Sequence, residues 1–149
     1  MRVAQSLYES GLITYMRTDS MNLSDLCLNS CGPVISSLMG DEYHQRRTYH
    51  THSKGAQEAH EAIRPTDMNR QTIEGDTREQ RLYELIWKRT IACQMADAKL
   101  ERTTVNIAVS ETDEMFQATG EVVRFDGFLR VYRESQGDDE NANADESKL

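Results

Sequence analysis

The sequence predicts an α+β fold in which a helical part is followed by a short antiparallel β segment. Two observations carry this prediction. Apolar residues recur at a helical period up to about Lys99, and the period then changes to two. With 38% hydrophobic and 28% charged residues, the composition is that of a globular chain, and 149 residues are enough for one sizeable core or two small lobes.

The first forty residues are expected to hold two helices joined by an extended stretch. Residues 3–8 have helical spacing and end before Gly11, whereas residues 13–18 are β-branched and aromatic. Residues 23–38 carry a second helical stripe, interrupted by Gly32-Pro33. Because proline lacks an N–H donor and disfavours helical geometry at the preceding residue, we expect a kink there or a new helix beginning at Pro33.

Two more helices are expected after a basic, histidine-bearing loop. Residues 56–63 predict a two-turn helix that ends at Arg64-Pro65, and Asp76 with Glu79 gives a capping signal for a long helix. At about 1.5 Å per residue, twenty residues would span about 30 Å, enough to join two lobes. The expected inner face of this helix consists of Leu82, Leu85, Ile86, Ala92, Met95 and Ala96.

The β segment is expected to contain three strands. Residues 104–109 alternate between apolar and polar, residues 111–114 form a turn, and residues 115–123 form a second strand. Asp126-Gly127 predicts a tight turn into a third strand over residues 128–132. From residue 136 onward the chain is too polar to pack and is expected to be disordered.

Charge and composition limit the classes of function. Residues 134–149 contain six acids and one base, so −5 of the net charge of −8 belongs to them and only −3 to the first 133 residues. Binding to nucleic acid would therefore need a local groove with a few placed cations. The sequence lacks a membrane-length apolar stretch and a signal-peptide pattern, and its three cysteines are expected to be reduced thiols in a cytoplasmic protein.

One segment, residues 11–20 (GLITYMRTDS), stands out for its chemistry. In an extended strand Tyr15 and Arg17 would lie on the same face. A phenol with a pKa of about 10 needs activation before it attacks, and a neighbouring arginine favours the phenolate and can hold a phosphate. A nucleophile beside a fixed cation is what transfer of a phosphodiester to tyrosine requires, and the aryl phosphate can be reversed without ATP.

A second segment, residues 56–66 (AQEAHEAIRPT), crowds polar side chains onto a short predicted helix. His60 and Arg64 form an i,i+4 pair that suits a phosphate or a nucleotide, while Gln57 and Glu58 can hydrogen-bond to base edges. Arg64 could instead cap the end of the helix, where a cation is favourable.

The two segments resemble those of the type IA DNA topoisomerases, in particular bacterial DNA topoisomerase I, and the resemblance extends over residues 2–133. It implies that Tyr15 becomes linked to the 5′-phosphate of a cleaved single strand and that Arg17 assists cleavage. It also implies that His60 contacts a bound nucleotide. Further residues expected at the DNA are Thr18, Gln57, Glu58 and Arg64.

The resemblance also implies an activity and a place in a longer protein. The implied enzyme cleaves and reseals one DNA strand to relax negative supercoils, using Mg²⁺ held by a Toprim domain of the same full-length chain. Its partners would be single-stranded and negatively supercoiled DNA in the cytoplasm, at the nucleoid. This chain would be an excised fragment, inactive alone and without a cofactor or metal of its own.

Within such a fragment the resemblance implies three parts. Residues 1–76 would form the helical nucleophile domain, and residues 77–133 the long helix and the antiparallel β part of a toroid arch. Residues 134–149 would be a disordered acidic tail.

Other functions stay open on the residues alone. The chain could be a single-strand DNA-binding module without catalysis, or a scaffold in which Tyr15 merely packs. A tyrosine recombinase or a rolling-circle nickase is a further option, although neither goes with the second segment. Cys27 and Cys31 could suggest a metal pair, but buried thiols account for them better because a complete four-ligand spacing is absent.

Overall fold

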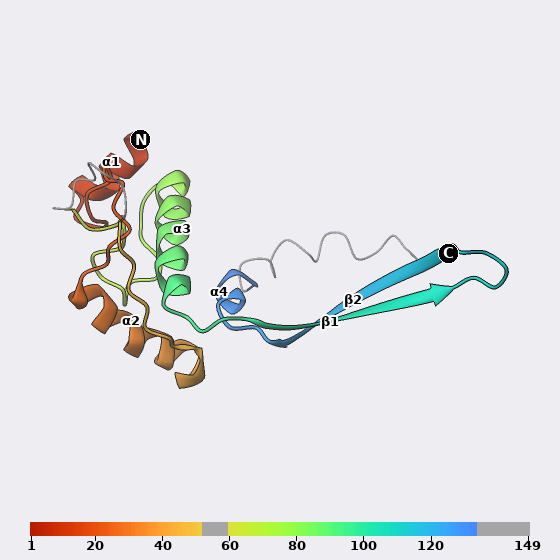
Figure 1. Cartoon of the computed structure of the whole chain (residues 1–149). Coiled ribbons are helices and arrows are strands. Elements are labelled where there is room, and N and C mark those ends of the chain that lie inside the picture. The colour runs from red at the N-terminus through yellow and green to blue at the C-terminus, as the bar shows by residue number, and fades with distance from the viewer. Residues whose placement is uncertain (52–59, 134–149) are drawn as a thin grey trace.

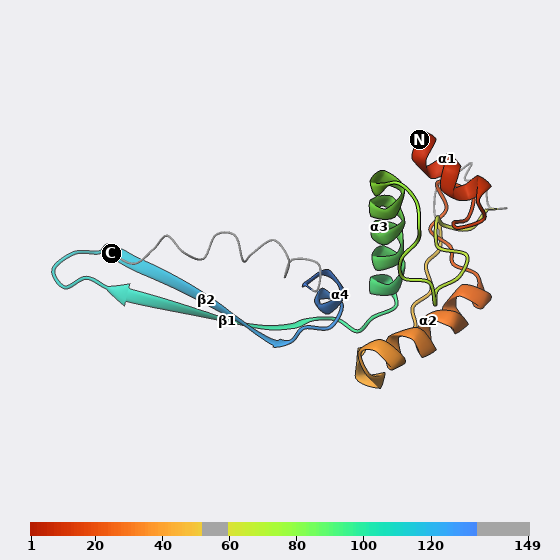
Figure 2. The ribbon, with the colours of Figure 1, turned by 180° about the vertical axis from the view of Figure 1, so that it is seen from behind.

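The computed structural model describes residues 1–51 and 60–133, and it has the predicted α+β composition. Its helices gather into a lobe, and a two-stranded hairpin extends from this lobe as a long arm (Figure 1). The view from behind shows the same arrangement, with α4 between the lobe and the arm (Figure 2). The elements are α1 (Arg2–Glu9), α2 (Asp25–Leu38), η1 (Asp41–Tyr43), α3 (Thr77–Cys93), β1 (Lys99–Ala108), β2 (Met115–Phe125) and α4 (Leu129–Arg133).

One hydrophobic core lies among the helices of the lobe. It joins Leu7 of α1 and Ile35 of α2 to Trp87 of α3, and it also includes Val131 of α4. Trp87 is buried, and its indole N–H donates to the carbonyl of Met68 at 2.9 Å. Residues on both sides of position 76 therefore share one core.

Among the described residues, no helix combines the length and the apolar character that a membrane span needs.

The beginning of α3 confirms the predicted cap. The carboxylate of Asp76 accepts a hydrogen bond from the backbone N–H of Glu79 at 2.9 Å, which satisfies one of the free donors at the helix start. The prediction for the inner face was wrong at Leu85, which is 59% exposed. The buried stripe instead runs through Tyr83, Trp87 and Ile91, whose spacing of four places the larger rings toward the core.

Helix α2 continues through Gly32-Pro33, so the expected new helix at Pro33 is wrong. Burial of neighbouring side chains such as Cys31 and Ile35 stabilises the helix despite the missing N–H donor. Glycine has a packing role at position 32, because a Cβ there would lie 3.0 Å from the imidazole Cε1 of His44.

The two segments with candidate chemistry are irregular. Residues 13–18 do not form a strand, and one isolated bridge pairs Ile13 with Pro65. The predicted helix over residues 56–63 is absent from its described part, residues 60–63, and the rest of it lies outside the described residues. The reason is that backbone groups of these segments bond to distant parts of the chain. The N–H of Ala62, for example, donates to the carbonyl of Asn22 at 2.8 Å.

The arm is an antiparallel ribbon whose two faces differ. Val105 pairs with Ala118 and Ile107 with Phe116 on one face, whereas Arg102 pairs with Glu121 on the other. The predicted third strand is wrong, because residues 129–133 form α4. Two features of the structure explain the helix: the N–H of Phe128 donates to the carbonyl of Ala96 at 2.9 Å, and α4 buries Val131 in the core of the lobe.

Candidate active site

The two segments singled out from the sequence lie side by side in the lobe. The N–H of Thr14 donates to the carbonyl of Arg64 at 2.9 Å, and the N–H of Thr66 donates to the carbonyl of Leu12 at 3.1 Å. The Thr14 hydroxyl adds two bonds: it accepts from the N–H of Arg64 at 2.9 Å and donates to the carbonyl of Ala62 at 2.8 Å. Segments about fifty residues apart are thereby fixed against each other.

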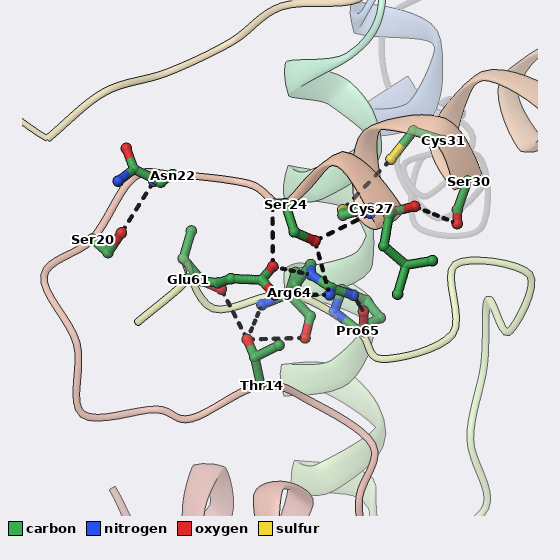
Figure 3. Close-up of polar contacts among 12 residues, drawn as sticks. Thr14, Ser20, Asn22, Ser24, Cys27, Ser30, Cys31, Glu61, Arg64 and Pro65 are labelled. Carbon is green, nitrogen blue, oxygen red and sulfur yellow. Dashed lines mark hydrogen bonds and ion pairs between the residues drawn. The ribbon is translucent and has the colours of Figure 1, made fainter. Parts of the chain in front are cut away.

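Arg64 forms the centre of a buried polar network behind these segments (Figure 3). Its side chain holds both carboxylate oxygens of Glu61, with Nε to Oε2 at 2.7 Å and Nη2 to Oε1 at 3.2 Å. Nη1 donates to the carbonyl of Pro65 at 3.0 Å, and Nη2 donates to the hydroxyl of Ser24 at 3.4 Å. Because Ser24 also caps α2, the network ties the second segment to the start of that helix.

Arg64 and Glu61 each stabilise the charged form of the other. Burial would lower the pKa of Arg64, but the hydrogen bond and the charge of Glu61 outweigh it and raise that pKa above its ordinary value. The same hydrogen bond lowers the pKa of Glu61, against the effect of burial. Both groups are therefore ionised at neutral pH, and their geometry is bidentate.

Arg64, for which a contact with DNA is predicted, is buried. Its residue is 6% exposed, and its guanidinium donates to Glu61, Ser24 and Pro65. A guanidinium in this position cannot reach a DNA phosphate without breaking the network. The alternative as a helix cap does not apply either, since residues 60–63 are not helical.

Tyr15 lies between aromatic rings from two other parts of the chain. Its ring centroid is 5.1 Å from that of His60, with a tilt of 38°, and 5.3 Å from that of Tyr8, edge to face at 69°. The contact with His60 brings together the two most distinctive residues of the two segments. Tyr15 is partly buried and packs against the core, which restricts the direction in which its phenol points.

The hydroxyl of Tyr15 distinguishes it from most other tyrosines of the chain. The phenols of Tyr43, Tyr49 and Tyr83 donate to Asp126 or to backbone carbonyls. Among the described residues, the Tyr15 hydroxyl has no hydrogen-bond partner, and the same holds for Tyr8. Tyr15 and its neighbour Tyr8 therefore offer phenols that are not committed to structural bonds within the described part of the chain.

The other predicted site residues lie as follows. Arg17 is exposed, and it has no acidic partner within residues 1–51 and 60–133. Thr18 uses its hydroxyl to accept from the N–H of Ser20 at 3.1 Å. Gln57 and Glu58 lie outside the described residues.

Sequence reasoning missed the supporting residues of this site. Ser24 is such a residue, and a serine before a helical stripe, a common N-cap, is the signal that could have found it. The sequence predicts Tyr8 only as part of the first helix. The ion pair between Glu61 and Arg64 is also not predicted, because the expected helix pairs Arg64 with His60.

The described residues do not bring together three His, Cys, Asp or Glu side chains in a way that could hold a metal ion. Cys27 and Cys31 are buried neighbours on α2, with their sulfur atoms 4.0 Å apart. The hydrogen bond with Cys27 and burial raise the pKa of the Cys31 thiol, as expected for a thiol in the core.

The chain resembles known DNA topoisomerases over nearly its whole length. A family model described as DNA topoisomerase matches residues 1–148. DNA topoisomerase 1 of Zymomonas mobilis is 49% identical over 151 aligned positions, which cover 99% of this chain and 12% of that protein. The Synechocystis DNA topoisomerase 1 is 49% identical over 148 positions, covering 95% of this chain and 16% of that protein.

A solved structure agrees with these sequence matches. The full-length topoisomerase I from Thermotoga maritima superposes with a TM-score of 0.74 and 34% sequence identity, covering 89% of this chain and 23% of that one. The chain thus spans less than a quarter of the length of each of these relatives. Its sequence and its fold agree in the assignment: the chain belongs to the DNA topoisomerase family.

Proposed function

We propose that the chain is the nucleophile-bearing part of a type IA DNA topoisomerase and that Tyr15 is the nucleophile. One observation carries the proposal: a phenol without a hydrogen-bond partner among the described residues packs against His60 of the second segment. Arg17, exposed and without an acidic partner in the described part of the chain, follows two residues later.

The proposed reaction is a reversible transfer of a DNA phosphodiester. The phenolic oxygen of Tyr15 attacks a backbone phosphorus, the new tyrosyl O–P bond forms, and the bond from phosphorus to the 3′ oxygen breaks. The phenol loses its proton and the leaving 3′ oxygen gains one. Because the phosphotyrosine keeps a phosphodiester, the freed 3′ hydroxyl can reverse the step without ATP. Passage of a strand through this break would relax negative supercoils.

The remaining residues have distinct proposed roles. Arg17 binds the phosphate and stabilises the charge that accumulates on it in the transition state. His60 lies beside the Tyr15 ring, where it can contact a bound nucleotide. Thr18 follows Tyr15 by three residues and keeps its proposed contact with the DNA. Gln57 and Glu58 keep their proposed place at the DNA. We assign Arg64 a positioning role, since it holds the second segment in place through Glu61.

The described residues do not supply a ligand set for the Mg²⁺ that the family resemblance implies. Glu61, the acid of the second segment in the described part, is held by Arg64. We therefore place the Mg²⁺ on a Toprim domain of a longer parent protein and assign it no step here. The proposed partners of that parent are single-stranded and negatively supercoiled DNA at the bacterial nucleoid.

The proposal is tested by relaxation of supercoiled plasmid by the full-length parent protein. Tyr15→Phe removes only the phenolic oxygen, so we expect loss of relaxation with single-strand binding nearly unchanged. Tyr8→Phe is the matched control and should keep activity. The ring centroid of Tyr8 lies 5.3 Å from that of Tyr15, and its hydroxyl also has no hydrogen-bond partner among the described residues. Relaxation by Tyr15→Phe at the rate of the unmodified protein would refute the proposed nucleophile.

For the isolated chain the second candidate function applies: single-strand binding without catalysis. It is favoured by the exposed Arg17, which has no acidic partner in the described part of the chain, and by the absence of a metal-binding cluster among the described residues. We expect that the 149-residue chain does not relax plasmid with or without Mg²⁺, and that its binding to single strands weakens steeply with salt. Relaxation by this chain alone would contradict this assignment.

A further inference from the structure

A pocket of about 420 Å³ lies on another side of the second segment. Ala62 and Ile63 form one wall, and the C-terminal part of α3 forms another. The remaining lining residues are Met21, Leu23, Arg47, Tyr49, Asp97, Phe128 and Tyr132. A volume of this size is in the range of pockets that take small ligands. The pocket is separate from the ring contacts of Tyr15, since Tyr15, Tyr8 and His60 do not line it.

The wall at Arg47 and Tyr49 is fixed by hydrogen bonds to Gln94 and Cys93. The fully buried side chain of Gln94 accepts from the N–H of Arg47 at 2.9 Å and donates to its carbonyl at 2.8 Å. The phenol of Tyr49 donates to the carbonyl of Cys93 at 3.1 Å. These contacts hold the ring of Tyr49 at the pocket while leaving it 36% exposed.

The two arginines of the pocket differ in their availability. Arg47 is engaged: its guanidinium donates to the carboxylate of Asp97 at 2.6 Å and to the carbonyl of Met95 at 2.7 Å. Arg89 is exposed on α3, and within the described residues no acid pairs with it. The pocket therefore offers one cation for an anionic group of a ligand.

The aromatic rings of the pocket indicate a second feature of the ligand, a flat ring that can stack on them. Tyr49, Phe128 and Tyr132 line the pocket together with the apolar side chain of Ile63. Aromatic faces next to an available arginine are the combination that binds a nucleobase and its phosphate in single-stranded nucleic acids. An apolar ligand alone would leave Arg89 without a role.

We propose that this pocket receives one nucleotide of a single-stranded DNA, with the base against Tyr49 and the phosphate at Arg89. The inference rests on the proposed function and extends it. The segment that carries His60 also forms the wall at Ala62 and Ile63, so the same strand of DNA can contact both sides of this segment. The proposal thus assigns a DNA contact to the far end of α3 that is independent of cleavage.

Cys93 provides a direct reporter of this pocket in the 149-residue chain. It lines the pocket and is partly exposed, whereas Cys27 and Cys31 are buried. Burial raises the pKa of the Cys93 thiol, so its alkylation should be followed at mildly alkaline pH. At a saturating concentration of an oligothymidylate of about eight nucleotides, we expect alkylation of Cys93 to slow by about tenfold. Cys93→Ser identifies the labelled thiol.

Matched variants separate the pocket from general attraction to DNA. Arg89→Gln should raise the oligonucleotide concentration needed for protection by about tenfold, the effect of one charge-assisted phosphate contact. Arg81→Gln is the control, because Arg81 is an exposed cation of the same helix that does not line the pocket. Tyr49→Leu should weaken protection by a similar factor, and Tyr49→Phe should keep it because the ring is retained.

The outcomes distinguish this proposal from the proposed nucleophile. Tyr15→Phe should leave the protection of Cys93 unchanged while abolishing relaxation by the parent protein. Unchanged alkylation of Cys93 in saturating oligonucleotide would overturn the pocket assignment without touching Tyr15, as would equal losses in Arg89→Gln and Arg81→Gln. Cys93 shielded in the full-length parent before DNA is added would also overturn it, since another protein segment would then fill the pocket.

Discussion

The lobe and the arm of this chain are stabilised in opposite ways. In the lobe, buried contacts join residues far apart in sequence, such as the bonds between Thr14 and Arg64. In the arm, every residue of β1 is exposed. The contacts that stabilise the ribbon are those between its two strands, such as the ion pair of Arg102 with Glu121. A two-stranded ribbon of this kind is marginal by itself. The candidate site is therefore fixed by the lobe, while the arm depends on its attachment.

That attachment is a compact joint at the base of the arm. The phenol of Tyr43 donates to the carboxylate of Asp126 at 2.6 Å and accepts from the guanidinium of Arg130 at 3.0 Å. The ring of Tyr43 also lies 4.8 Å from that of Phe125. The hydrogen bond to Asp126 raises the pKa of Tyr43, so this phenol stays protonated as a donor. The joint connects the end of β2 and α4 to the lobe.

The largest expected effect is loss of the network in the lobe. Arg64→Ala leaves the Glu61 carboxylate beside a buried cavity and removes contacts to Ser24 and Pro65. We expect the free energy of unfolding to fall by about 3 kcal/mol in denaturant titrations. Arg81→Ala, an exposed change on α3, should alter it by less than about 0.5 kcal/mol. Equal effects of the two variants would show that the network does not stabilise the lobe.

The next largest effect is expected for substitution of Gly127 in the joint, compared with substitution of Gly120 in the arm. A Cβ on Gly127 would lie 2.5 Å from the carbonyl oxygen of Ala96, and its φ of +50° is unfavourable for other residues. Gly127→Ala should therefore cost about 2 kcal/mol of unfolding free energy. Gly120→Ala in β2, with open space around its Cβ, should be neutral or slightly stabilising. Thermal unfolding of both variants checks the prediction, which fails if Gly120→Ala is the more harmful.

A smaller effect follows from the titration of Glu61. Its pKa in the folded chain is lowered by Arg64, so its contribution to stability is present above its ordinary pKa of 4.5 and is lost as pH falls through the folded value. Because the side chain is 34% exposed, the contribution should be at most about 1 kcal/mol. Unfolding measured between neutral and acidic pH should reveal it, and Glu61→Gln should reduce the loss of stability on acidification. An identical pH profile for Glu61→Gln would contradict this account.

The smallest effect is expected in the arm. Both partners of the Arg102–Glu121 pair are solvent-exposed, with Arg102 at 70% and Glu121 at 43% side-chain exposure. Glu121→Gln should change the free energy of unfolding by about 0.5 kcal/mol or less, and less still at high salt. A loss comparable to that of Arg64→Ala would show that the arm contributes to stability as much as the lobe.

The predictable parts of the fold are those decided locally. The cap at Asp76 and the two hairpin strands with the turn between them follow from neighbouring residues, and both match the sequence prediction. The continuation of α2 through Pro33 and the helix at residues 129–133 depend on packing against distant segments, so a new helix at Pro33 and a third strand, both suggested by local preference, are wrong. A helix propensity or an alternating pattern carries no information about such contacts.

The candidate site divides in the same way. The residue types and their order pointed to Tyr15, Arg17 and His60 as the chemical groups, and the structure brings Tyr15 and His60 into contact. The burial of Arg64 could not be predicted, because it results from bonds to Ser24 and from pairing across fifty residues. Sequence patterns thus indicated the chemistry, whereas the geometry that supports it required the fold.

The most direct test of the central claim identifies the residue that becomes linked to DNA. The full-length parent protein would be incubated with a single-stranded oligonucleotide, the covalent complex trapped by denaturant, and the modified peptide sequenced by mass spectrometry. We predict a phosphodiester on Tyr15 joined to the 5′ end of the cleaved strand, and none on Tyr8, whose ring lies 5.3 Å away. An adduct on Tyr8, or a covalent complex formed by Tyr15→Phe, would contradict the assignment.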